Sequence, residues 1–207
     1  MLIKTLVLGP IENNCYVVTD ESTLDCAVID PAGDATYLLD YLEDNRLHCR
    51  LALLTHAHFD HVGAVAELME ETGAQLYMHP ADNGTPIGFD GNVFAAPEGT
   101  RFLSDGDMLD LGGIRFTVYE TPGHTPGGLT YLAQQGEDRV LFTGDTLFRD
   151  SCGRTDFRLS DGEAMLRSLR RLAALPGDYE VCPGHGFATT LDRERRVNYF
   201  MRMATQG

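Results

Sequence analysis

The chain has 207 residues, of which 43% are hydrophobic, a fraction that is normal for a folded globular protein and excludes a disordered chain. No apolar run approaches the 18 residues of a membrane-spanning helix. The N-terminal segment MLIKTLVLGP is also too short for the apolar part of a secretion signal. We therefore expect a single domain over residues 1–207 and no membrane partner.

Acidic residues outnumber basic ones by 31 to 16, which gives a net charge of −15. Such a surface repels phosphate backbones, so we expect no nucleic-acid partner. The charge is uneven, because residues 1–148 hold six basic and 23 acidic residues, whereas residues 149–207 hold ten and eight. The basic residues of the C-terminal part either lie on solvated helix faces or form a positive rim that tolerates an anionic substrate.

The cysteines indicate a reducing compartment. Their number is odd and no two of them form a CxxC pair; they are Cys15, Cys26, Cys49, Cys152 and Cys182. This pattern is typical of reduced thiols rather than of a disulfide framework. We expect a cytoplasmic protein.

Short apolar runs bounded by Gly, Pro, Asn and Asp predict strands along the whole chain. These runs are 2–8, 15–19, 26–29, 51–54, 75–78, 114–119, 129–132, 140–143 and 179–182. Helical spacing of apolar residues predicts helices over 35–42, 62–69 and 165–173, the last opened by a capping box between Ser160 and Glu163. A further helix is predicted near 192–203. Strands interspersed with helices indicate two sheets covered by helices, an α/β layered architecture.

One long segment, residues 84–100, contains no helical pattern. Loops of this length are uncommon unless they are functional or mobile. An irregular surface connection is the alternative.

The densest chemistry lies directly after the apolar run 51–54, in the segment THAHFDH at residues 55–61. It places His56, His58, Asp60 and His61 within six residues at the end of a predicted strand. Four polar side chains so close together cannot all find partners in a dry core, and a plain solvated loop has no reason to be rich in imidazole. Imidazole and carboxylate together ligate Zn²⁺, Fe²⁺ or Mn²⁺, so this segment predicts a metal site.

Three further polar residues lie in the same kind of position, just past an apolar run and beside glycine. His124 stands in TPGHTPGG (121–128), Asp145 in FTGDT (142–146) and His185 in PGHG (183–186). Glycine lets the backbone approach a metal closely and adopts the unusual φ values of sharp turns. Each residue alone would be an ordinary loop residue, but together the four strand ends predict one shared site.

Through these motifs the chain resembles the metallo-β-lactamase superfamily over nearly its whole length, from His56 to the PGHG at 183–186. Within it, the single-domain glyoxalase II-like hydrolases are the most similar branch, through THAHFDH, TPGHTPG, LFTGDTLF, CGRTDF and PGHG. The resemblance implies an αββα four-layer sandwich with the metal site at the open edge of the two sheets. Asp145 in place of Cys is unlike the antibiotic-hydrolysing branch, and 207 residues leave no room for the insertion of the superfamily's nucleases.

The resemblance also implies two divalent metal ions, Zn in the simplest case, with Fe or Mn as alternatives. The ligands it implies are His56, His58 and His124 on one ion, Asp60, His61 and His185 on the other, and Asp145 bridging both.

Seven protein ligands on two ions leave positions for a bridging water, whose pKa a divalent ion lowers towards about 7. The resulting hydroxide would attack a substrate carbonyl whose oxygen the same ions polarise. We assign Asp60 the additional catalytic role of orienting this hydroxide, because its carboxylate lies between His58 and His61 in the sequence. A non-catalytic metal module is disfavoured, since seven ligands cannot saturate two five- or six-coordinate ions.

We do not expect the remaining histidines to protonate the leaving group. Five of the seven histidines are assigned as ligands, and His48 and His79 lie outside the metal motifs. A leaving group that departs as an anion is therefore favoured, and a thiolate qualifies because a thiol pKa is about 8.5. A metal-bound water that donates a proton is the alternative. We expect a small-molecule thioester substrate, and the resemblance points in the same direction, to S-hydroxyacyl-glutathione.

In the family that the chain resembles, a basic residue and a Tyr that follow the GDTLF segment contact the carboxylate of the thiol. Arg154 fits the basic position and is our candidate substrate-binding residue, whereas Thr155 and Asp156 supply no Tyr. Only 22 residues follow His185, where two-domain glyoxalase II enzymes add a helical domain. The alternative role of Arg154 is an ion pair with Asp150 or Asp156.

A dioxygenase is the competing function. Persulfide dioxygenases share the fold and a similar CGRTDF segment, and they use one iron. His56, His124 and Asp145 alone form the two-histidine, one-carboxylate set of Fe(II) oxygenases. The sequence leaves both functions open.

Overall fold

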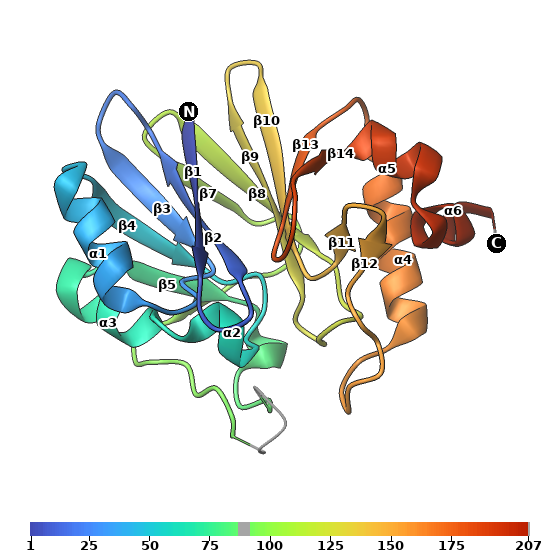
Figure 1. Ribbon diagram of the computed structural model, residues 1–207, viewed down its shortest axis with the longest axis horizontal. Helices are drawn as coiled ribbons and strands as arrows, with labels where there is room; N and C mark the ends of the chain where they lie inside the picture. The colour runs from blue at the N-terminus through green and yellow to red at the C-terminus, as the bar shows by residue number, and fades with distance from the viewer. Residues whose placement is uncertain (87–91, 207) are drawn as a thin grey trace.

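Two six-stranded sheets pack face to face in the computed structural model, which describes residues 1–86 and 92–206 (Figure 1). In spatial order, the strands of the first sheet are β1 (Leu2–Leu8), β2 (Asn13–Thr19), β3 (Asp25–Ile29), β4 (His48–Leu53), β5 (Gln75–Met78) and β6 (Arg101–Phe102). Strands β1 to β3 are antiparallel, and strands β3 to β6 are parallel. Parallel strands require cover on both faces, which explains the continuous apolar run in β4.

The second sheet is mostly antiparallel. In spatial order its strands are β14 (Thr189–Thr190), β13 (Glu180–Pro183), β10 (Asp138–Gly144), β9 (Leu129–Gln135), β8 (Ile114–Glu120) and β7 (Met108–Leu111). Only β10 and β13 pair in parallel. Beyond β10, the short strands β11 (Leu147–Phe148) and β12 (Ser151–Cys152) form a hairpin. All nine predicted strands are present. The four-residue strand β7 and the two-residue strands β6, β11, β12 and β14 were not predicted.

Helices cover the outer face of each sheet (Figure 1). They are α1 (Ala35–Asp44), α2 (Phe59–Val62) and α3 (Val65–Thr72) beside the first sheet, and α4 (Gly162–Ala173), α5 (Leu191–Val197) and α6 (Tyr199–Gln206) beside the second. A short 3₁₀ helix, η1 (Pro80–Asp82), follows β5.

Three hydrophobic cores separate these layers. Leu38 belongs to the core between α1, α3 and the first sheet, and Leu169 belongs to the core between the second sheet and α4. Tyr16 and Phe142 join the two sheets in the central core, with an edge-to-face contact between ring centroids 5.1 Å apart. The prediction of an αββα four-layer sandwich is confirmed.

The helix predicted over 62–69 is interrupted at Gly63. The amide of Gly63 donates to the carbonyl of Ala32 at 3.0 Å, and a Cβ at this position would collide with that same oxygen. The amide of Ala64 likewise donates to the carbonyl of Pro31 at 2.8 Å. Because both amides bond to another loop instead of continuing the helix, Val62 ends α2 and Val65 begins α3.

Two further helix predictions need correction. The cap of α4 is Asp161, whose carboxylate accepts from the amides of Glu163 and Ala164, so the capping box with Ser160 is wrong. The helix predicted near 192–203 is two helices, α5 and α6. They are separated at Asn198, which is extended and whose side chain caps the amide of Phe200.

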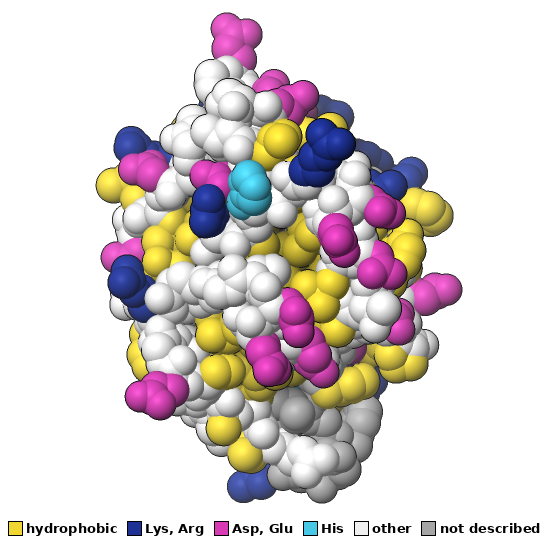
Figure 2. Space-filling model, turned by 90° about the vertical axis from the view of Figure 1, so that its left-hand side faces the viewer, with side chains coloured by type: hydrophobic (Ala, Val, Ile, Leu, Met, Phe, Trp, Pro, Cys, Tyr) yellow, Lys and Arg dark blue, Asp and Glu magenta, His cyan; other side chains and the backbone are white. Residues whose placement is uncertain are grey.

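The face covered by α1 and α3 is acidic. Neither helix contains a Lys or Arg, and six exposed acidic residues lie on them: Asp40, Glu43, Asp44, Glu67, Glu70 and Glu71. Figure 2 shows acidic side chains spread over this side of the molecule. Within residues 1–86 and 92–206, no helix has the length and apolar character needed to cross a bilayer. All five cysteines are free.

Candidate metal centre

Four strand ends bring the predicted ligands to one edge of the sandwich. The segment 55–61 follows β4, His124 lies between β8 and β9, Asp145 follows β10, and His185 follows β13. The parallel pairing of β10 with β13 brings Asp145 and His185 together, and the amide of Gly184 donates to Gly144 O at 2.9 Å. Across the two sheets, the amide of Leu129 donates to Thr55 O at 2.7 Å. These backbone bonds hold the loops against one another.

The structure gathers all seven predicted ligand side chains into one cluster. Three overlapping groups have ligand atoms within 4.8 Å of one another: His56, His58 and His124; His56, His61 and Asp145; Asp60, His61 and His185. The His58 Nδ1 and His124 Nε2 atoms are 2.9 Å apart, and the His185 Nε2 and Asp60 Oδ2 atoms are 3.1 Å apart. Oδ1 of Asp145 is 3.5 Å from Nε2 of His61, and its Oδ2 is 3.4 Å from Nε2 of His124. A carboxylate between the two halves fits a bridging position.

Two buried ligand atoms in this cluster lack a hydrogen bond within the described residues, namely Nε2 of His56 and Oδ1 of Asp145. A buried polar atom without a partner is costly, and a metal ion at the centre of the cluster would satisfy both. Imidazole nitrogens and carboxylate oxygens are also the donors that Zn²⁺, Fe²⁺ and Mn²⁺ accept. The residues present therefore fit divalent metal ions.

The electrostatics at two of the ligands, His58 and Asp145, favour a bound cation. Burial and the neighbouring His124 lower the pKa of His58 to about 4. Burial raises the pKa of Asp145, but the imidazoles of His61 and His124 outweigh this effect and hold the pKa below its ordinary value. A neutral imidazole and an ionised carboxylate are the forms that ligate metals.

The sequence analysis did not identify Asp30, which lies directly behind the cluster. Its carboxylate is 2.9 Å from Nδ1 of His61 and accepts from the amide and the hydroxyl of Thr55, both at 2.7 Å. These contacts orient His61 and the start of the THAHFDH segment together. Asp30 follows directly after the apolar run 26–29, the same strand-end position that singled out Asp145, so the signal was present in the sequence.

A second unpredicted carboxylate, Asp82, connects two ligand loops. It accepts from the amide of Ala57 at 3.1 Å, from the hydroxyl of Thr125 at 2.9 Å and from the amide of Gly127 at 2.7 Å. The first donor lies between His56 and His58, and the other two follow His124. Asp82 is buried in η1. It lies so far along the chain from both ligand loops that no local sequence pattern could connect it with the site.

The histidines open onto a cavity of about 740 Å³. Its described apolar wall consists of Ile11, Phe59, Pro86, Pro126, Phe148, Phe157 and Leu159, and its polar wall includes Ser151, Cys152, Arg154, Arg158 and Ser160. The ring of Phe157 lies 5.4 Å from that of His58 and 5.5 Å from that of His124, between centroids. The cavity therefore joins the metal cluster to a mainly apolar wall.

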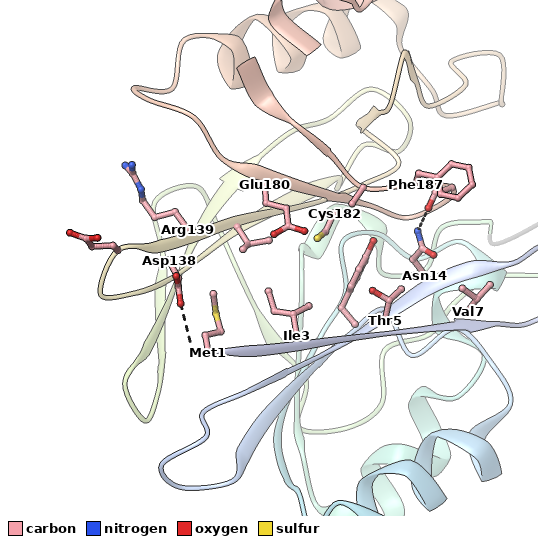
Figure 3. A pocket seen from close by; sticks show the side chains of 15 residues that line it. Met1, Ile3, Thr5, Val7, Asn14, Asp138, Arg139, Glu180, Cys182 and Phe187 are labelled. Atoms are coloured by element: carbon pink, nitrogen blue, oxygen red, sulfur yellow. Dashed lines mark hydrogen bonds and ion pairs between the residues drawn. The ribbon is translucent and has the colours of Figure 1, made fainter. Parts of the chain in front are cut away.

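A second cavity of similar volume lies between β1 and β13 (Figure 3). Ile3, Thr5 and Val7 line it from β1, with Glu180 and Cys182 opposite. No histidine lines the described part of this cavity, so the metal chemistry belongs to the first one.

Arg154 lines the metal-site cavity, but its guanidinium is already engaged. Its Nε and Nη2 atoms each donate to the Asp156 carboxylate at 2.9 Å, and its guanidinium carbon lies 4.7 Å from the ring centroid of Phe157. The ion pair with Asp156 that the sequence allowed is therefore present, and one with Asp150 is not among the described contacts. Substrate binding by Arg154 stays a prediction.

The comparisons with known proteins agree with this geometry. Residues 8–185 match the model of the metallo-beta-lactamase superfamily. The hydroxyacylglutathione hydrolase GloC of Haemophilus influenzae is 34% identical, and the match covers 97% of this chain and 98% of that protein.

Two solved structures are similar over almost their full lengths. BLEG-1, described as a B3 metallo-beta-lactamase, has a TM-score of 0.88 and 35% identity, with 97% of this chain and 99% of that one covered. TTHA1623 in a di-iron-bound form has a TM-score of 0.82 and 38% identity, with 95% and 99% covered. The chain belongs to the metallo-β-lactamase superfamily. It is a metallohydrolase-fold protein whose His and Asp cluster is suited to divalent metal ions.

Proposed function

We propose that the protein is a thioesterase that hydrolyses small-molecule thioesters, of which S-hydroxyacyl-glutathione is the model substrate. Two divalent ions, Zn in the first instance, would fit the cluster. His56, His58 and His124 would hold one ion, Asp60, His61 and His185 would hold the other, and Asp145 would serve both. The hydroxyacylglutathione hydrolase named among the similar proteins supports this choice of substrate, and the di-iron protein supports iron as the alternative metal.

When bound, divalent ions at this cluster would lower the pKa of a water molecule towards neutrality and polarise the substrate carbonyl. The protein's own contribution centres on Asp60, which lines the cavity and whose Oδ2 lies 3.1 Å from His185 Nε2 and 3.4 Å from His61 Nε2. From this position its carboxylate accepts a hydrogen bond from the attacking water and fixes the direction of attack. Asp30 keeps the ring of His61 in place, and Asp82 keeps the two ligand loops in register.

The observation that carries the proposal is that the described wall of the cavity offers no imidazole, carboxyl, phenol or ammonium group outside the metal cluster as a general acid. No Tyr, Lys or Glu lines it, and its three histidines all belong to the cluster. His48 is exposed beside Asp25, and His79 caps η1 and faces Glu120 at 3.3 Å. An amide or alkoxide leaving group needs a proton from such an acid, whereas a thiolate departs without one.

The shape of the cavity supports a small organic substrate. Ile11, Phe59 and Leu159 each expose between 41% and 49% of their surface at its wall, although large apolar side chains gain by burial. A substrate with an apolar portion would cover them.

The test is a substrate panel with one acyl group carried as a thioester, an oxygen ester and an amide, on enzyme reconstituted with Zn, Fe or Mn. We expect kcat/KM for the thioester to exceed that for the oxygen ester at least a hundredfold, with two ions per chain by metal analysis. A β-lactam belongs in the panel because BLEG-1 is described as a B3 metallo-beta-lactamase. Preferred turnover of the β-lactam, or one Fe per chain with O₂ uptake on a persulfide, would overturn the proposal.

A further inference from the structure

A tight turn at residues 157–160 forms part of the rim of the metal-site cavity. The amide of Ser160 donates to Phe157 O at 3.1 Å, which closes the turn and leaves Arg158 and Leu159 at its two central positions. The turn is anchored to His124, because the Ser160 hydroxyl donates to His124 O at 2.7 Å and the Phe157 ring packs on that imidazole. Arg158 is therefore held at a defined place on the rim.

Arg158 differs from the other arginine of the cavity in its partners. Arg154 makes a two-pronged ion pair with Asp156 and stacks on Phe157, so its guanidinium already has a carboxylate partner. Arg158 is exposed and has neither an ion pair nor a hydrogen bond within the described residues. It is the uncompensated cation of the described cavity wall.

The charge of the whole molecule makes this cation significant. A net charge of −15 repels an anionic ligand at long range, and the acidic face over α1 and α3 adds no local attraction. A cation at the rim favours an anion at that place, and a guanidinium without an ion pair among the described residues pairs well with a carboxylate.

The geometry points to Arg158 as the residue that selects substrates whose leaving thiol carries a carboxylate. This inference rests on the proposed thioesterase activity and names the substrate class within it. Arg154 contacts Asp156 and Phe157 and so stabilises the rim of the cavity, while Arg158 binds the carboxylate of the substrate. The substrate is then a thioester with an apolar body at the Phe157 and Leu159 wall and a carboxylate at the rim.

The test uses two thioesters with the same acetyl group, one of 3-mercaptopropionate and one of its uncharged amide. In Arg158→Gln we expect the ratio of kcat/KM for the anionic over the neutral thioester to fall about tenfold, chiefly through KM. Arg158→Lys should retain part of the preference. The preference of the unmodified enzyme should shrink with added salt, because exposed charges are screened over about 10 Å at 0.1 M.

Arg167→Gln is the matched control, because it changes the net charge equally on an exposed position of α4 outside the cavity. An unchanged ratio in Arg158→Gln, or an equal fall in Arg167→Gln, overturns the inference. A tenfold fall in Arg154→Gln alone would assign the carboxylate to Arg154 instead and also overturn it.

Failure of the proposed function has a separate signature, namely no hydrolysis of either thioester. In that case calorimetric binding of 3-(methylthio)propionate and its amide decides the inference. Preferential binding of the carboxylate that Arg158→Gln abolishes supports it, and equal binding by both proteins contradicts it.

Discussion

Oδ2 of Asp30 lies 2.9 Å from Nδ1 of His61, with both side chains buried behind the metal cluster. This contact directs the opposite nitrogen, Nε2, towards Asp60 and Asp145 at 3.4 and 3.5 Å. The orientation of a metal-binding histidine is usually fixed by such a partner on its other nitrogen. Asp30 is thus a positioning residue for the candidate centre.

Replacing Asp30 by Asn should weaken metal binding by about 10- to 100-fold, because the amide supports the His61 ring less strongly than a carboxylate. Asn tolerates the left-handed backbone at this position, where φ is 51°, so the fold should survive. Competition against a chelator measures the affinity. Asp20→Asn is the control: Asp20 is also buried and bonds to Ser22 and Gly113 away from the site. A similar loss in both variants would indicate general destabilisation.

The bridging assignment of Asp145 predicts a difference between two variants. Asp145→Ala should lower the occupancy of both ions, because one carboxylate serves each of them, whereas His185→Ala should lower mainly the second. Metal content per chain after dialysis reports both values. Equal and nearly complete retention in the two variants would contradict a two-ion centre.

Asp60→Asn should reduce kcat at least about a hundredfold, the range of a positioned acid–base group. Asn keeps the shape and some ligating ability of the side chain but cannot orient the attacking water as a charged acceptor. Thermal stability should change much less, because the backbone of α2 is untouched. Unchanged kcat at full metal occupancy would refute the catalytic role of Asp60.

Gly153→Ala should disrupt the site without touching a ligand side chain. A Cβ at position 153 would overlap the carbonyl oxygen of Asp145 and lie 3.2 Å from Nδ1 of His124. We expect loss of metal and a lower melting temperature, because the ligand loops must move apart. Gly162→Ala is the control: the added Cβ would meet only Thr155, at 3.5 Å or more, at the first position of α4. Equal behaviour of the two variants would show that the crowding at Gly153 is unimportant.

Local patterns predicted the strands well because burial on both faces leaves an uninterrupted apolar run, as in β4 and β10. Local patterns predicted the helix boundaries less well, because a tertiary contact can override the helical spacing of apolar residues. The helix over 62–69 is interrupted because Gly63 packs against Ala32, a residue of a different loop. Asp161 replaces Ser160 as the cap of α4 because the Ser160 hydroxyl is bound to His124 O instead.

The sequence by itself determined the layered α/β architecture and pointed to the seven side chains of the candidate centre, because each of them lies shortly after a recognisable apolar run. Only the tertiary structure decided which groups support and surround that centre. Asp82 joins loops 25 and 43–45 residues away from it along the chain, and such long-range contacts leave no local pattern. The sequence singled out Arg154 by its motif and gave no reason to consider Arg158. In the fold, the carboxylate of Asp156 pairs with Arg154, whereas Arg158 has no ion pair with any other described residue.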